Sequence, residues 1–213
     1  MPGNLCNSAK DSEALESLKG NPAIQRLAGF ASAAFATWAP KLYQCYQQKM
    51  GALYKKHPEL ERTFTNSIWS TSTFNFGPKT VCLDHIDFKN LAFGMCAITA
   101  LGNFDPKLGG HIILWDLKMV IEFPPGTTSI IPSAILRHSN TLIQECETRM
   151  SFTQYTSGGL FRWVDYGFQG VSQLFAANKE RKVELKAELE AEGSARWQMG
   201  LGLFSTFKEL LVK

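Results

Sequence analysis

The sequence predicts an α+β fold in which a barrel-like core of short β-strands has helices at both ends. Two stretches, 21–56 and 176–212, carry apolar residues at helical spacing. Between them, short runs rich in β-branched and aromatic residues alternate with turns that contain Gly and Pro. The length of 213 residues suits one domain with a substantial core. We therefore expect a single domain with a helical support at 1–66, a β core at 67–170 and C-terminal helices at 171–213.

The N-terminal support is expected to contain two main helices. Residues 1–20 are small and polar, and they predict a frayed arm or a short helix. Pro22 lies at a first-turn position, where proline is favoured, and apolar residues follow it at helical spacing. Pro40 should interrupt this helix. A second helical pattern continues from there to about Lys56.

The C-terminal region is also expected to be helical. Residues 176–192 are rich in Lys, Glu, Ala and Leu, with opposite charges at helical spacing, which predicts a solvated amphipathic helix. Gly193 and Ser194 should break it. A last helix is expected at 196–212, where apolar residues recur at helical spacing.

The central region is expected to form short strands at a spacing that is typical of a barrel-like fold. The stretch 91–101 is apolar on both faces, so it should be a central strand. Pro and Gly at 124–126 should form the turn that leads into the strand at 128–138. The expected strands cover 67–77, 80–87, 91–101, 112–115, 118–123, 128–138 and 149–155.

Three residues of this region form a candidate metal site. His85 and Asp87 are two apart on an expected strand, so their side chains should share a face. His138 closes the strand at 128–138. Two neutral imidazoles and one carboxylate occupy one face of an octahedral metal ion and leave the other face open, as in non-haem Fe(II) oxygenases. His111 competes for a ligand role, but its same-face neighbour is an isoleucine, so we expect it to be structural or substrate-lining.

The last expected strand carries a candidate anion site. Arg149, Ser151 and Thr153 alternate along 149–155, so they should share one face of the strand. A guanidinium at this position can bind a carboxylate through two parallel hydrogen bonds, and the nearby hydroxyl adds another.

Five motifs occur in a fixed order along the central region. They are His85-x-Asp87, Gly109-Gly110-His111-Ile112-Ile113-Leu114-Trp115, Phe123-Pro124-Pro125-Gly126, His138-Ser139-Asn140 and Arg149-x-Ser151. In this order they resemble the double-stranded β-helix, a jelly-roll and cupin-like core, of the Fe(II)/2-oxoglutarate-dependent dioxygenases. Within that class the chain looks most like the mushroom (basidiomycete) transposon-associated branch of the TET/JBP family, which oxidises methylated bases in nucleic acid. The resemblance covers residues 71–170, about half of the chain.

The resemblance implies a set of cofactors and their ligands. Fe(II) would be held by His85, Asp87 and His138, with 2-oxoglutarate as co-substrate and O2 as oxidant. The distal carboxylate of 2-oxoglutarate would meet Arg149 and Ser151. Asn75 lies ten residues before His85, where a residue of the resembling branch reaches the co-substrate; as bare sequence, it equally fits a turn at the end of a strand.

The resemblance also implies the reaction. The chain would be an oxidoreductase of the EC 1.14.11 type that converts 5-methylcytosine in DNA to 5-hydroxymethylcytosine and further products, with succinate and CO2 as co-products. N6-methyladenine is another candidate base, and the target base would be flipped out of the duplex. Phe88, Lys89 and Asn90 follow the metal ligands in a loop, where substrate contacts concentrate, although packing or solvent exposure would explain each of them singly.

Arg162 and Trp163 form a second candidate substrate contact. A cation beside a flat ring is a combination that binds stacked bases. The alternative is structural: Trp163 would cap the barrel, and Arg162 would form an ion pair with Asp165.

A cupin-type metal enzyme without 2-oxoglutarate is disfavoured because the sequence has no His-x-His pair, and two other functions stay open. The first is a 2-oxoglutarate dioxygenase with the same metal site that hydroxylates a small molecule, RNA or protein. The second is a non-catalytic, transposon-derived binding module that keeps the fold. Retention of His85, Asp87, His138 and Arg149 together argues against the second, because a decayed site has no physical need for all four residue types.

The whole-chain properties add few constraints. The formal net charge of +3 permits a basic face for nucleic acid but does not demand one. Five cysteines are scattered without a CxxC pair, which disfavours a zinc module or a disulfide framework. The first residues are polar, and no apolar stretch of about 18 residues occurs. We therefore expect an intracellular protein, nuclear or cytoplasmic, without a membrane partner, and no oligomeric state is predicted.

Overall fold

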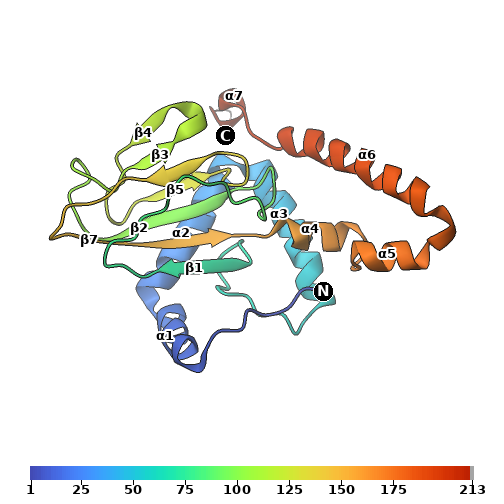
Figure 1. Ribbon diagram of the computed structural model, residues 1–213, viewed down its shortest axis with the longest axis horizontal. Helices are drawn as coiled ribbons and strands as arrows, with labels where there is room; N and C mark the ends of the chain where they lie inside the picture. The colour runs from blue at the N-terminus through green and yellow to red at the C-terminus, as the bar shows by residue number, and fades with distance from the viewer. Residues whose placement is uncertain (212–213) are drawn as a thin grey trace.

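The computed structural model describes residues 1–211 and contains two antiparallel sheets with helices packed on one side (Figure 1). The larger sheet has the strand order β1-β7-β2-β5, and the smaller sheet has the order β4-β3-β6. The strands are β1 Thr71–Asn75, β2 Cys96–Asn103, β3 Ile112–Leu114, β4 Met119–Ile121, β5 Thr128–Ile131, β6 His138–Asn140 and β7 Thr148–Tyr155.

The chain alternates between the two sheets, and this alternation defines the fold. β1 lies in the larger sheet, and the segment after it bridges to β6 of the smaller sheet through His85 and His138. β2 returns to the larger sheet, β3 and β4 belong to the smaller one, and β5, β6 and β7 alternate again. This is the winding of a double-stranded β-helix, so the predicted α+β fold with a jelly-roll core is confirmed.

The long helices α2 (Pro22–Trp38) and α3 (Pro40–Lys56) pack on one side of the larger sheet, whereas α5 and α6 extend away from it (Figure 1). Asn21 caps α2 by accepting a hydrogen bond from the backbone N–H of Ala23 at 2.9 Å, and Pro40 occupies the first turn of α3. The predicted break at Pro40 between two long helices is therefore confirmed. The helices are α1 Ala9–Gly20, α2 Pro22–Trp38, α3 Pro40–Lys56, α4 Gly158–Asp165, α5 Val171–Ala177, α6 Lys182–Leu201 and α7 Phe207–Leu211.

Aromatic side chains fill the space between these helices and the sheet. The ring of Phe35 on α2 stacks on Trp69 with centroids 5.3 Å apart, and Tyr46 on α3 meets Phe161 on α4 edge-on at 4.9 Å. The Tyr46 hydroxyl accepts a hydrogen bond from the Met95 backbone N–H at 3.2 Å. Burial of each such ring contributes about 1.5–3 kcal/mol, so α2, α3 and α4 fix the position of the sheet that carries Arg149.

Two expected strands differ in the structure. The stretch 128–138 forms β5 and β6, which belong to different sheets. Pro132 lies between them; it has no N–H for a ladder, and its carbonyl accepts hydrogen bonds from Ile135 and Leu136 at 3.1 and 3.0 Å. The stretch 80–87 has no continuous strand and makes a single bridge, from His85 to His138, because its partner strand β6 is only three residues long.

The central strand begins later than expected, and one helix is additional. β2 begins at Cys96, because residues 91–94 form a turn in which Gly94 N–H donates to the Leu91 carbonyl at 2.8 Å. α4 follows Ser157, whose hydroxyl accepts from the Gly159 N–H at 3.2 Å. Two glycines at the start of α4 hide its helical signal, and burial of Phe161 stabilises it instead.

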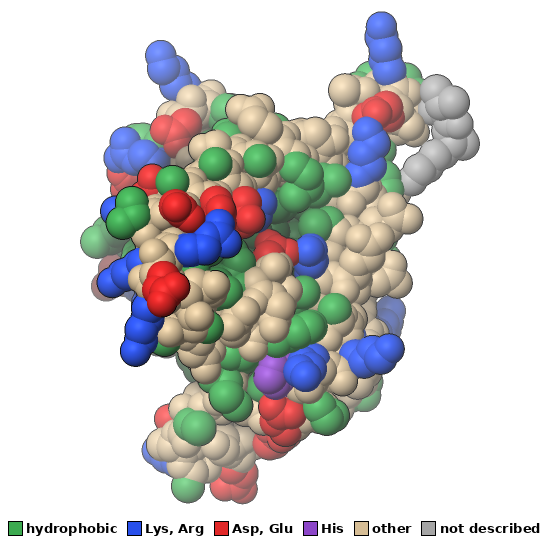
Figure 2. Space-filling model, turned by 90° about the vertical axis from the view of Figure 1, so that its right-hand side faces the viewer, with side chains coloured by type: hydrophobic (Ala, Val, Ile, Leu, Met, Phe, Trp, Pro, Cys, Tyr) green, Lys and Arg blue, Asp and Glu red, His purple; other side chains and the backbone are tan. Residues whose placement is uncertain are grey.

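The predicted helix break at Gly193 and Ser194 is wrong. α6 runs through both residues, because a helical glycine costs only about 1 kcal/mol and ion pairs such as Arg196–Glu192 at 3.3 Å support the helix. α7 is short, and Val212, the end of the expected last helix, lies outside the described residues. Figure 2 views the molecule from the α5–α6 end, where Lys and Arg side chains are interspersed with Asp and Glu. Within residues 1–211, no helix has the length and apolar character needed to cross a membrane.

The buried thiol of Cys96 predicts a pH-dependent contribution to stability. Burial raises the pKa of this thiol to about 12, whereas an unfolded chain ionises cysteine at about 8.5. The contribution is therefore complete below the unfolded pKa and is lost as the pH rises toward the folded one. Cys96→Ala should lower the free energy of unfolding measured in urea. We expect this loss to shrink by up to about 1.4 kcal/mol for each pH unit above the unfolded pKa. Cys6→Ala, at an exposed cysteine, is the control, and a cost independent of pH would contradict the prediction.

Candidate metal centre

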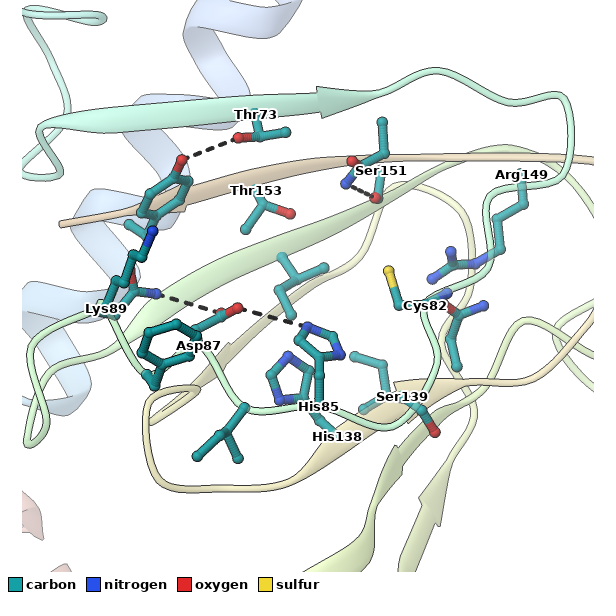
Figure 3. A pocket seen from close by; sticks show the side chains of 18 residues that line it. Thr73, Cys82, His85, Asp87, Lys89, His138, Ser139, Arg149, Ser151 and Thr153 are labelled. Atoms are coloured by element: carbon teal, nitrogen blue, oxygen red, sulfur yellow. Dashed lines mark hydrogen bonds and ion pairs between the residues drawn. The ribbon is translucent and has the colours of Figure 1, made fainter. Parts of the chain in front are cut away.

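Three side chains from separate parts of the chain converge beneath the larger sheet. His85 and Asp87 come from the irregular segment between β1 and β2, and His138 begins β6. Each offers one ligand atom, and these atoms lie within 4.8 Å of one another. Figure 3 shows the three side chains pointing toward one another on one side of a cavity.

The two histidines are held together by their own backbones. The His85 N–H donates to the His138 carbonyl at 3.1 Å, and the His138 N–H donates to the His85 carbonyl at 3.0 Å. The ring centroids are 4.3 Å apart. A single residue pair of an antiparallel bridge therefore brings both imidazoles to one place, although neither neighbouring segment forms a long strand.

Each imidazole is oriented by a backbone carbonyl two residues before it. Nδ1 of His85 lies 2.7 Å from the Leu83 carbonyl oxygen, and Nδ1 of His138 lies 2.9 Å from the Leu136 carbonyl oxygen. A carbonyl accepts only, so Nδ1 carries the hydrogen in both rings. This leaves the Nε2 lone pairs available for a metal ion, as in most histidine ligands.

Asp87 supplies the single carboxylate. Its backbone N–H donates to the Ser133 carbonyl at 2.8 Å, which ties it to the turn between β5 and β6. One carboxylate oxygen lies 3.6 Å from His85 Nε2, and the other accepts a hydrogen bond from the Asn90 amide at 3.4 Å. Two neutral nitrogen donors and one charged oxygen donor fit a divalent transition metal such as Fe(II).

A buried guanidinium lies at the other end of the cavity. Arg149 on β7 is 3% exposed, and its Nη1 donates to the Thr80 carbonyl at 3.1 Å. Its Nε is buried without a hydrogen-bond partner, and Arg149 forms no ion pair within residues 1–211. Burial lowers the pKa of the guanidinium, yet an arginine stays charged at neutral pH. This positive charge therefore lacks a counter-ion on the described chain.

Ser151 and Asn75 line the cavity beside Arg149. The expected alternation is present, since Arg149, Ser151 and Thr153 all line the cavity (Figure 3). Asn75 ends β1 opposite Ser151, and its amide donates to the Ser151 hydroxyl oxygen at 2.9 Å. The hydroxyl hydrogen of Ser151 stays free for another acceptor.

The cavity has a volume of about 470 Å³ and joins the metal ligands to the arginine. This size is in the range of small-ligand sites. Phe88, Lys89 and Asn90 also line it, as expected for the loop after the ligands. Phe88 is 75% exposed, and the Lys89 ammonium lies 5.8 Å from the centroid of its ring.

Arg162 and Trp163 lie on α4 and are not among the residues that line this cavity. The Trp163 indole N–H donates to His57 Nε2 at 3.0 Å, and the ring packs against the helical core. The alternative ion pair of Arg162 with Asp165 is not formed, because Asp165 pairs with Lys49. The structure therefore does not bring these two residues to the other site residues.

His111 stays outside the ligand group, as expected. Its Nδ1 lies 3.1 Å from the Thr141 hydroxyl oxygen, and the same hydroxyl accepts from the His111 backbone N–H at 3.0 Å. Asp84, which neighbours His85, forms an ion pair with Arg137.

Asn140 has a structural role that the sequence analysis did not assign. Its Oδ1 accepts from the Cys82 N–H at 2.7 Å, and its Nδ2 lies 3.4 Å from the Thr80 carbonyl oxygen. The same carbonyl accepts from Arg149. One amide therefore joins β6, the segment that leads to His85, and the guanidinium. The only sequence signal was its place in the motif that starts at His138.

We expect Asn140→Ala to weaken Co(II) binding by about 10-fold, because groups that orient a ligand segment typically matter by this amount. Asn140→Asp keeps the acceptor for Cys82 and should lie between alanine and wild type. Titration calorimetry under reducing conditions measures the affinities. Asn103→Ala, at an exposed end of β2, is the control. If the wild type, both Asn140 variants and the Asn103 variant bound Co(II) equally well, the hydrogen bonds of Asn140 would not support the metal site.

Fold and site together define a double-stranded β-helix protein with a candidate mononuclear metal centre. No protein-family model matches this sequence, and neither does any curated protein. Among solved structures, the chain is similar to NgTET1 in complex with 5mC DNA, with 18% identity, a TM-score of 0.41 and coverage of 65% of this chain. It spans only 53% of that chain. A viral collagen prolyl hydroxylase from Paramecium Bursaria Chlorella virus-1, solved as a 2OG complex, is similar at 14% identity and a TM-score of 0.29, over 51% of this chain and 68% of that chain.

Proposed function

We propose that this protein is an Fe(II)- and 2-oxoglutarate-dependent dioxygenase. One observation carries the proposal: a two-histidine, one-carboxylate group shares a cavity with a buried arginine that has no carboxylate partner within residues 1–211. Burying a charge without a partner is costly. A dicarboxylic co-substrate would compensate this cost when it binds and would extend toward the three ligands.

The anion end of the cavity would select the co-substrate. Arg149 would bind the distal carboxylate through its free N–H groups, since a guanidinium matches a carboxylate bidentately. Ser151 would donate its hydroxyl hydrogen to the same carboxylate, because Asn75 already donates to the hydroxyl oxygen. These contacts would hold the 2-oxo acid in one orientation before any chemistry.

The metal end would be prepared by the Nδ1–H tautomers of His85 and His138 and by the carboxylate of Asp87. Fe(II) held by these three side chains would supply dioxygen activation at the positions that they leave open. The Asn90 amide would keep the carboxylate of Asp87 oriented. The apolar side chain of Ile98 in the cavity wall would limit access of water.

We infer that the substrate is a methylated base in DNA, with 5-methylcytosine as the first candidate and N6-methyladenine as the second. The ordered series of five motifs supports this, since it resembles the transposon-associated branch of the TET/JBP family. Phe88 would offer a flat ring, and Lys89 and Asn90 would offer donors to the base or its phosphate. The products would be the hydroxymethyl base and further oxidised forms, with succinate and CO2.

The proposal is tested by loading the protein with Fe(II) under anaerobic conditions and then adding methylated duplex DNA, 2-oxoglutarate and air. Mass spectrometry of digested DNA and succinate assays should show oxidised base, with one succinate formed for each oxidation step. Succinate without an oxidised base would instead favour a small molecule, RNA or protein substrate. No succinate from a metal-loaded protein would favour a non-catalytic binding module.

A further inference from the structure

Within residues 1–211, the smaller sheet ends in an apolar strand that pairs on one side only. β4 is the edge strand of this sheet, and its three residues are all exposed. Figure 1 shows the β3–β4 hairpin at the margin of the fold. An edge of this kind presents unpaired backbone groups to another strand. Five exposed large apolar side chains lie on the hairpin: Trp115 (46%), Leu117 (55%), Met119 (47%), Val120 (64%) and Ile121 (37%).

The pairing pattern shows which backbone groups of β4 face outward. His138 directs both its N–H and its carbonyl to His85, so its pair with Leu114 on β3 is of the non-hydrogen-bonded kind. Leu114 therefore directs its groups to Met119 on β4. In the next pair, which contains Val120, the backbone N–H and carbonyl groups point the opposite way. The N–H and carbonyl of Val120 consequently point to the free side of β4.

The charges that flank β4 are self-complementary. Lys118 precedes the strand and Glu122 follows it, and both are exposed. Neither forms an ion pair within residues 1–211. If a second copy of β4 lies antiparallel with Val120 opposite Val120, Lys118, whose backbone is left-handed (φ 52°) just before the strand, lies beside Glu122 of the other copy. Met119 then lies opposite Ile121, so the directly opposed residues are apolar and oppositely charged residues flank them.

We propose that β4 is a homodimer interface, in which two copies pair antiparallel about Val120. The outward N–H and carbonyl of each Val120 exchange hydrogen bonds, and the two small sheets become one continuous sheet. The arrangement is two-fold symmetric and closed, so it ends at the dimer. A second copy is the occupant because the strand is complementary to itself in both charge and hydrophobicity. β4 is short, so the interface is small and the fraction of dimer depends on the protein concentration.

Sedimentation velocity of the full-length chain over a concentration series tests the proposal. The wild-type chain should approach twice its mass of 23.7 kDa as concentration rises. Lys118→Glu or Glu122→Lys alone places like charges beside each other at both symmetric positions, so each should raise the dimer dissociation constant by about 10-fold or more. The double variant K118E/E122K reverses both charges and should restore the wild-type constant. A monomer at every concentration, or a dimer unaffected by the single changes, would overturn the proposal.

A crosslink tests the register independently of affinity. Directly opposed residues of a hydrogen-bonded antiparallel pair have Cα atoms about 5.5 Å apart, which a disulfide can bridge. Val120→Cys should therefore give a covalent dimer on mild oxidation. Val183→Cys, at a position on α6 that is 84% exposed, is the matched control, and the wild-type chain controls for the exposed Cys6 and Cys146. Equal crosslinking of both variants, or none at Val120→Cys, would refute the register. Neither experiment depends on oxygenase activity.

Discussion

Replacement of His138 with alanine is expected to abolish succinate formation and to reduce metal affinity by more than about 100-fold. Changes to groups that only support a ligand already cost roughly 10–100-fold in metal affinity, and this change removes a ligand itself. It leaves one imidazole and one carboxylate, which hold a divalent ion poorly. Calorimetric titration with Co(II) and a coupled succinate assay measure the two effects.

His111→Ala is the matched control for this change. His111 is bonded to Thr141 and lies outside the group of three ligands, so the variant should bind metal like the wild type. Circular dichroism of both variants separates loss of a ligand from loss of the fold. Metal affinity unchanged in His138→Ala would contradict the ligand assignment, and loss in both variants would point to a general role of the smaller sheet.

The sequence was most informative where a local pattern decides the structure. Alternation along β7 correctly placed Arg149, Ser151 and Thr153 on the face that lines the cavity. Pro22 and Pro40 marked helix starts because proline fits the first turn of a helix but not its interior.

The candidate metal site shows that predicted residues can come together although the predicted local structure is partly wrong. His85 and Asp87 were expected to share a face because of an extended strand, yet the strand is reduced to a single bridge. Their convergence comes from hydrogen bonds to His138 and Ser133, about 50 residues away in sequence. A period-two pattern predicts direction only along one strand and contains no information on such partners.

The remaining errors have the same origin. The run 128–138 has apolar residues on both sides of Pro132, and its division there is decided by the two sheets that its halves join. The continuity of α6 through Gly193 depends on summed ion pairs rather than on one weak residue. The structural role of Asn140 depends on its hydrogen bonds to Thr80 and Cys82, about 60 positions earlier. Each outcome is determined by tertiary contacts, which override local propensity.

Arg149→Met is expected to raise the KM for 2-oxoglutarate by about 30- to 1000-fold while the fold and the metal affinity are retained. Loss of one partner of a buried, hydrogen-bonded charge pair costs about 2–4 kcal/mol. Methionine fills similar space without placing a charge in the cavity. Arg149→Lys should lie between methionine and wild type, because an ammonium cannot form the two parallel hydrogen bonds. Arg26→Met, on the exposed surface of α2, is the control.

A shortened co-substrate distinguishes loss of this contact from general damage to the site. A 2-oxo acid without the distal carboxylate cannot form an ion pair with Arg149, so wild type and Arg149→Met should use it equally poorly. In a double-mutant cycle the penalty for the amino-acid change should therefore vanish with the shortened acid. If the penalty were the same with both acids, Arg149 would act through the structure around Thr80 and not through the carboxylate. If Arg149→Met used 2-oxoglutarate as well as the wild type does, the buried charge would have no role in binding the co-substrate, and the selectivity for a dicarboxylic acid would have to come from other residues.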